Sequence, residues 1–150
     1  MKKFYRAIAL AAALLLSMAA SAEMVAITIN EEQEDAIEMH KATGAKVQVI
    51  KTHDKAYPTV IRATYKDGVA TYLVTDAIAK GSTKVSRQVI VSRNNDALRG
   101  LGTWFNKQTD YQIVTADKWK TEKDGDKIVV YFEPVNLYGE GIMIEKERFK

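Results

Sequence analysis

Apolar and polar residues alternate along much of the chain, which is the pattern of β-strands with one buried face. The clearest case is a pair of segments, Thr59–Lys66 and Val69–Thr75, on either side of Asp67-Gly68. This dipeptide favours a two-residue hairpin turn, because Asp and Gly tolerate the positive φ angles that the turn requires. Pairing across the turn places one set of side chains on a single buried face. The set is Ile61, Ala63, Tyr65, Ala70, Tyr72 and Val74.

Two other segments have apolar residues at helical spacing. The first helix is expected from Glu31 to Thr43, with Asn30 as its N-cap. The second is expected to begin after Asn94 or Asn95, and Gly100 and Gly102 each weaken it by about 1 kcal/mol relative to Ala. Its apolar residues are Leu98, Leu101, Trp104 and Phe105.

Strands interspersed with two amphipathic helices predict an α+β fold, an antiparallel β-sheet with two helices packed on it. The order of elements reads β-α-β-β-β twice, which is compatible with a tandem duplication with half-repeats 23–83 and 84–150. Gln48-Val49-Ile50 recurs as Gln112-Ile113-Val114 in the second half. Chance similarity between two helix-plus-sheet halves is the alternative. The remaining strands are expected at Met24–Ile29, Ala45–Thr52, Lys84–Arg93, Asp110–Ala116, Lys127–Glu133 and Ile142–Glu147.

The first 22 residues have the three parts of a secretory signal peptide. A basic start (Lys2, Lys3, Arg6) precedes an apolar run, and Ala20-Ser21-Ala22 supplies small residues for a signal peptidase. The apolar run is shorter than the roughly 20 residues that span a bilayer, although an uncleaved anchor is the alternative. We therefore expect residues 23–150 to form one exported α+β domain without a stable membrane anchor. The expected location is the periplasm, and secretion is the alternative.

The charge balance limits the kinds of partner to expect, and the absence of cysteine limits the covalent linkages that the chain can form. The chain has 22 Lys and Arg against 19 Asp and Glu, and the excess lies within the expected signal peptide. The expected mature chain is therefore neutral overall, which does not favour a nucleic acid or an anionic membrane as partner. No Cys is present, so the fold has no disulfide and the export signal has no lipid-bearing cysteine.

Candidate catalytic chemistry is sparse in this sequence. His40 and His53 are the two histidines, and their spacing does not match a zinc site. No serine lies in a nucleophile-elbow pattern. We expect His40 to lie near the end of its helix, interacting with the helix dipole. The sequence thus predicts no catalytic residue, metal site or cofactor, and an enzyme built from scattered carboxylates is the third interpretation.

The favoured function is a non-catalytic exported protein- or peptide-binding module, of the periplasmic inhibitor, immunity or assembly-factor type. The alternative is a periplasmic carrier of a small apolar ligand or lipid. Candidate partner-binding residues are Trp119, Leu137, Tyr138, Arg87 and Arg93. Trp119 lies between two lysines, Leu137 and Tyr138 lie in a glycine-containing loop, and the two arginines alternate with valines on a predicted strand. Each also has a structural interpretation, as a core residue, a cap on the sheet edge or part of a solvated face.

Overall fold

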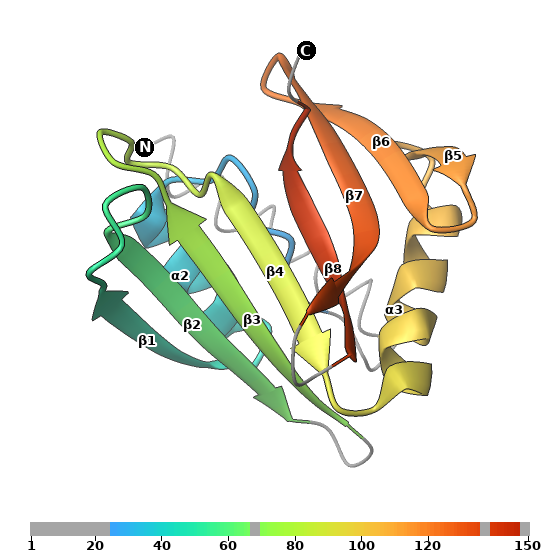
Figure 1. The fold of residues 1–150 in the computed structure, drawn as a ribbon, viewed down its shortest axis with the longest axis horizontal. Helices are drawn as coiled ribbons and strands as arrows, with labels where there is room; N and C mark the ends of the chain where they lie inside the picture. The colour runs from blue at the N-terminus through green and yellow to red at the C-terminus, as the bar shows by residue number, and fades with distance from the viewer. Residues whose placement is uncertain (1–24, 67–69, 136–138, 148–150) are drawn as a thin grey trace.

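One antiparallel sheet of eight strands, in the order β1-β2-β3-β4-β8-β7-β6-β5, forms the framework of the protein (Figure 1). The computed structural model describes residues 25–66, 70–135 and 139–147, so the predicted signal peptide lies outside the described residues. The helices are α2 (Gln33–Ala42) and α3 (Asn95–Asn106). The strands are β1 (Lys46–Lys51), β2 (Thr59–Lys66), β3 (Thr71–Ile78), β4 (Arg87–Ser92), β5 (Gln112–Thr115), β6 (Lys118–Lys123), β7 (Asp126–Val135) and β8 (Gly139–Lys146). The predicted α+β architecture is confirmed.

Both helices pack on the same face of the sheet, which we call the helix face. The strand register aligns Tyr65 with Tyr72 and Val74 with Ile90, and Ile90 is in turn opposite Ile142. These side chains form one core with the apolar side of α3, while α2 covers β1 to β3. The buried residues of α3 are Ala97, Leu98, Leu101, Gly102 and Phe105. The opposite face, which we call the open face, has neither of these helices over it.

The β2–β3 hairpin confirms the predicted face and corrects the predicted register. All the side chains expected on its inner face are buried, from Ile61 to Val74. Tyr65 pairs with Tyr72 and not with Ala70, so the connection is longer than the two-residue turn expected. Because side chains alternate with a period of two, this shift of two residues leaves every side chain on its predicted face. The residues of the expected turn, 67–69, lie outside the described residues.

Each helix is followed by four strands, and the two groups of strands meet where β4 pairs with β8 (Figure 1). The tandem β-α-β-β-β duplication is not confirmed. Its expected first strand, Met24–Ile29, is not a strand over the described residues 25–29, whereas Lys84–Arg93 contains β4. One strand was also missed, since β6 follows β5 after a short turn, where the sequence predicted only the strand Asp110–Ala116.

The starts of the two helices differ, although an asparagine was expected to cap each. Asn94 caps α3, because its side chain accepts a hydrogen bond from the backbone N–H of Ala97 at 3.0 Å. Asn30 does not cap α2, whose N-cap position is Glu32. Asn30 has a φ of 65° and donates instead to Asp126 Oδ2 at 2.7 Å. Its amide therefore connects the start of α2 to the β6–β7 turn.

Gly102 explains how α3 packs closely despite its two glycines. A Cβ at this position would lie 2.7 Å from the ring of Phe132, which is closer than carbon atoms normally approach. The glycine therefore lowers helix propensity but lets the Phe132 ring lie against the helix backbone. The guanidinium of Arg99 lies 4.2 Å from the centre of the same ring, so α3 contacts Phe132 through both residues.

Candidate functional site

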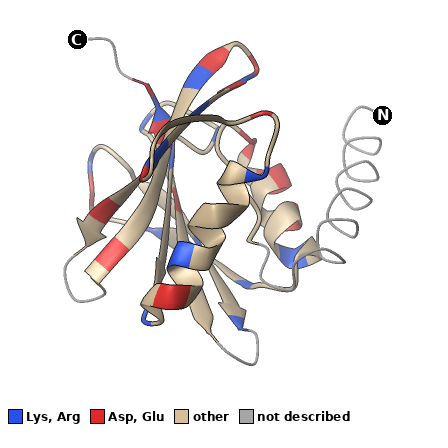
Figure 2. Ribbon diagram, turned by 90° about the vertical axis from the view of Figure 1, so that its right-hand side faces the viewer, with Lys and Arg blue, Asp and Glu red and all other residues tan. Residues whose placement is uncertain are grey.

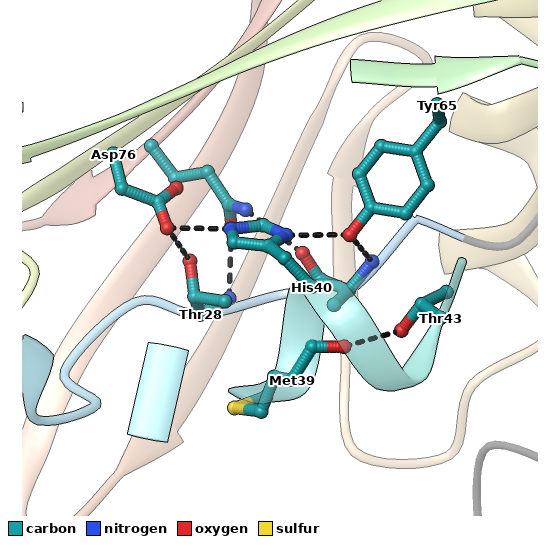
Figure 3. A network of polar contacts seen from close by, with 8 residues as sticks. Thr28, Met39, His40, Thr43, Tyr65 and Asp76 are labelled. Carbon is teal, nitrogen blue, oxygen red and sulfur yellow. Dashed lines mark hydrogen bonds and ion pairs between the residues drawn. The ribbon is translucent and has the colours of Figure 1, made fainter. Parts of the chain in front are cut away.

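A fully internal group of polar side chains lies between α2 and the sheet (Figure 3). We call Thr28, His40, Tyr65, Asp76 and Gln88 the buried network. His40 comes from α2, and Tyr65, Asp76 and Gln88 come from β2, β3 and β4. All have relative exposures of 0%, except Tyr65 at 6%. Burial of this many polar groups is tolerated only where hydrogen bonds replace water.

The hydrogen bonds of the buried network run in one direction toward Asp76. Tyr65 Oη lies 2.5 Å from His40 Nδ1, and His40 Nε2 lies 2.6 Å from Asp76 Oδ2. Burial raises the pKa of the Tyr65 phenol far above its ordinary value, so Tyr65 is neutral and its O–H is available to His40. The remaining imidazole N–H then donates to Asp76. Thr28 also donates to the same carboxylate oxygen, at 2.7 Å.

The buried network holds residues 25–30, which we call the N-terminal segment, against the helix face. The side-chain amide of Gln88 accepts from Thr28 N at 3.0 Å and donates to Ala26 O at 2.8 Å. Ala26 N donates to Tyr65 Oη at 3.3 Å. Side chains thus satisfy backbone groups that a neighbouring strand would otherwise pair. This is why the segment, although apolar enough to resemble a strand, forms none.

An Asp–His–Tyr arrangement resembles a proton relay, but its position prevents catalysis on an external substrate. His40 and Asp76 have no exposed side-chain surface. A catalytic base must come within hydrogen-bond distance of the proton that it removes. The buried network therefore has a structural role, which is to hold the N-terminal segment against the helix face. His40 lies in the last turn of α2, as expected, and its side chain points into the core, where it contacts Tyr65 and Asp76 (Figure 3).

Trp119, one of the expected partner-binding residues, is part of the core. Its relative exposure is 1%, and its ring lies between those of Phe105 and Phe132, with centroid distances of 5.4 Å and 6.0 Å. Its indole N–H donates to Asn106 Oδ1 at 2.8 Å. The structural interpretation of Trp119 replaces the binding one, because no partner reaches this ring in the folded protein. Leu137 and Tyr138 lie outside the described residues, so their binding role stays a prediction.

Arg87 lies on the open face, whereas Arg93 follows the end of β4 and is exposed. Arg87 Nε donates to Glu145 Oε2 at 3.2 Å, and the guanidinium lies 5.2 Å from the centre of the Tyr57 ring. Tyr131 donates to the other oxygen of Glu145 at 2.7 Å, and burial together with this carboxylate raises the pKa of Tyr131 to about 12. Glu145 is thus held between a cation and a phenol.

Apolar residues cross the centre of the open face. In the strand register, Val89 lies between Thr75 and Met143, and Met143 is opposite Tyr131. The adjacent row aligns Leu73 with Val91 and Gly141. A Cβ on Gly141 would lie 3.1–3.2 Å from the side chains of Val91 and Val135, which lie close over the glycine. We call Leu73, Val89, Val91, Met143 and Tyr131 the apolar strip. Leu73, Val89 and Tyr131 are half-buried, whereas Val91 and Met143 are buried among their neighbours, at 9% and 7% exposure.

Two hollows lie near the β5–β6 hairpin, at the opposite end of the sheet from β1. One of about 430 Å³ is lined by Ile27, Ile29, Asp110, Tyr111, Thr121, Glu122 and Lys123. The neighbouring one, of about 400 Å³, is lined by Asp110, Gln112, Lys120, Thr121, Glu122, Lys127 and Glu147. Both open to solvent and have charged walls, whereas carriers of apolar ligands have enclosed apolar cavities.

The described residues contain no group of three or more His, Asp or Glu side chains that could hold a metal ion. His53, the second histidine, is exposed in the connection between β1 and β2. None of the helices in the described part of the chain is long and apolar enough to cross a membrane. Comparison of the chain with protein-family models, with curated proteins and with solved structures gave no match.

Proposed function

We propose that the protein is an exported, non-catalytic module that binds a protein or peptide partner through the open face of its sheet. The apolar strip is the observation that carries this proposal. The outward positions of an antiparallel sheet are normally polar where that face meets only water. Here Leu73 and Val89 are half-buried at such positions, and Met143, between them and Tyr131, is 7% exposed, although neither helix covers this face. Apolar residues surrounded by charged ones are the usual composition of a partner-binding surface.

Export is supported by the signal-peptide pattern of residues 1–22. The periplasm is the proposed location, and secretion is the alternative. A module without disulfides that binds one partner there fits the inhibitor, immunity or assembly-factor type. A non-catalytic role is supported by the buried network, whose histidine and aspartate are out of reach of any substrate.

The carrier of a small apolar ligand or lipid is less well supported. The hollow near Tyr111 has room for a small molecule, but Asp110, Glu122 and Lys123 contribute to its lining. An apolar ligand in the hollow would remove water from these charged groups and form no hydrogen bonds with them, which costs free energy. A polar ligand remains compatible with it, but no buried polar group points to a particular chemistry.

We also propose that the two halves descend from one unit of a helix followed by four strands. Two observations support a common origin. The order of strands is mirrored about the β4–β8 pair. The similar tripeptides Gln48-Val49-Ile50 and Gln112-Ile113-Val114 lie in β1 and β5, which are the first strands of their halves and the two edges of the sheet.

A photo-crosslinking residue at Thr75 tests the proposed function, because Thr75 is half-buried in the middle of the open face, between Arg62 and Val89. The full-length variant is expressed in a bacterium and irradiated in the periplasm, and it is then recovered from that fraction. We expect one discrete adduct with another protein, and an intact mass for the unreacted protein that begins at Glu23.

The control variant carries the same crosslinker at Glu38, which is exposed on α2. It should give no adduct, because α2 lies on the opposite face of the sheet. Adducts of the same size from both positions, or from Glu38 alone, contradict the open face as the binding surface. A mass that retains residues 1–22 contradicts export with cleavage.

A further inference from the structure

We propose that the partner bound on the open face is acidic, and that Arg62 is its main anchor. This inference rests on the proposed function and names the chemistry of the partner. Charge is unevenly distributed over the open face, which the overall composition does not show. A protein with no net charge can still carry an excess of one sign of charge on one face.

The open-face positions of β1 to β4 include several basic residues and no Asp or Glu. The outward residues of β1 and β2 are Lys46, Gln48, Ile50, Val60, Arg62, Thr64 and Lys66. Those of β3 and β4 are Thr71, Leu73, Thr75, Ala77, Arg87, Val89 and Val91. The acidic residues in this half of the protein gather instead around α2, on the opposite face of the sheet (Figure 2). In this half of the protein the sheet therefore separates basic from acidic side chains, whereas the open-face positions of β7 and β8 include Glu133 and Glu145.

Arg62 lies near the centre of this basic surface. It is opposite Gln48 on one side and Thr75 on the other, and it is exposed. No carboxylate of the described residues forms an ion pair with it, whereas Arg87 is already held by Glu145. The Gln48 amide and the Thr75 hydroxyl beside it are groups that could share hydrogen bonds to a bound carboxylate. Arginine binds carboxylates through two parallel hydrogen bonds, which makes it a strong anchor for an acidic side chain.

The same surface argues for a protein partner. Exposed cations at Lys46, Arg62 and Lys66 are separated by Thr, Val and Leu side chains, so the charge density is low. Nucleic acids and anionic membranes are bound mainly through many closely spaced Lys and Arg contacts. A surface that alternates single cations with apolar and hydroxyl side chains suits a partner that alternates carboxylates with apolar groups.

Two synthetic probes test this inference with the mature protein. One is a fluorescent twelve-residue peptide that alternates Glu with Leu and Thr, and the other is the same peptide with Lys in place of Glu. We expect the acidic peptide to bind, with an affinity that falls as salt is raised, because the contacting charges are exposed to solvent. The basic peptide should not bind detectably.

Arg62→Glu should weaken binding of the acidic peptide about tenfold or more, since it replaces attraction by repulsion. Lys41→Glu is the matched control, because it makes the same change of charge at an exposed position of α2 and should change the affinity less than twofold. Equal losses in the two variants, equal binding of the two peptides, or no binding of the acidic peptide overturns the inference. Binding to vesicles of anionic phospholipid in preference to the peptide also overturns it.

These outcomes are distinguishable from failure of the proposed function. A Thr75 adduct with a partner whose binding does not change in Arg62→Glu leaves the open face as the site and removes only the acidic chemistry. Adducts confined to Glu38 remove the proposed function itself.

Discussion

Asp76→Ala is expected to destabilise the protein by about 2–6 kcal/mol, the cost of leaving two buried hydrogen-bond donors without their acceptor. The carboxylate accepts hydrogen bonds from both Thr28 and His40 in a site without water-exposed surface. Its removal leaves two buried donors without an acceptor, and each such group costs about 1–3 kcal/mol. Because domains of this size are stable by only about 5–15 kcal/mol, much of the total is lost. Chemical denaturation followed by circular dichroism measures this difference.

Asp117→Ala is the control for that substitution. Asp117 also accepts a side-chain hydrogen bond, from the Arg99 guanidinium, but its side chain is 55% exposed. Exposed pairs contribute about 0–1 kcal/mol, so this variant should remain close to the parent protein. The stability of Thr28→Val should lie between those of the two Asp variants, because this change removes one of the two hydrogen bonds that Asp76 accepts and keeps the side-chain shape. An Asp76→Ala variant as stable as Asp117→Ala would show that the buried network does not hold the fold.

Trp119→Ala is expected to cost about 3–5 kcal/mol, as large-to-small substitutions in a packed core do. The indole fills the space between Phe105 on α3 and Phe132 on β7, and its loss leaves a cavity between helix and sheet. For a domain of this size we expect the melting temperature to fall by roughly 10 °C or more. Differential scanning calorimetry measures the fall.

Trp104→Ala is the natural comparison. Because Trp104 is only half-buried, its substitution should lower the stability less than Trp119→Ala does. The pair also tests the reassignment of Trp119 from binding surface to core. A Trp119→Ala variant that melts with the parent protein but loses its partner would restore the binding role that the sequence indicated.

The features that the sequence predicted correctly depend on short-range patterns. The alternation around Tyr65 and Tyr72 identified the buried face, since that face depends only on odd and even positions. Asn94 was identified as a cap because it precedes an amphipathic helix and its side chain binds the first turn. Asn30 precedes a helix in the same way, but Asp126 of a distant turn takes its amide, and no local pattern shows that contact.

The buried network could not be predicted because it depends on the path of the N-terminal segment. Asp76 and Gln88 are polar residues that a sequence places in loops or on solvated faces. They are buried because residues 25–30 lie over them, and this arrangement is a contact between parts of the chain about 50–60 positions apart. The one available signal was that both occupy inward positions, in step with Val74 and Ile90. The strand β6 was missed for a similar reason, since its sequence is mostly charged around Trp119.

Methyl-group NMR of the mature protein, titrated with the partner captured at Thr75, tests the proposed binding surface most directly. Adjacent residues on β3 and on β4 supply an internal control. Leu73 and Val89 face outward, whereas the next residues, Val74 and Ile90, face the core. Binding to the open face predicts large shifts for the methyls of Leu73, Val89 and Met143, with small shifts for Val74 and Ile90. Shifts concentrated on Ile37 of α2 or Leu98 of α3, with the open-face methyls unchanged, would contradict it.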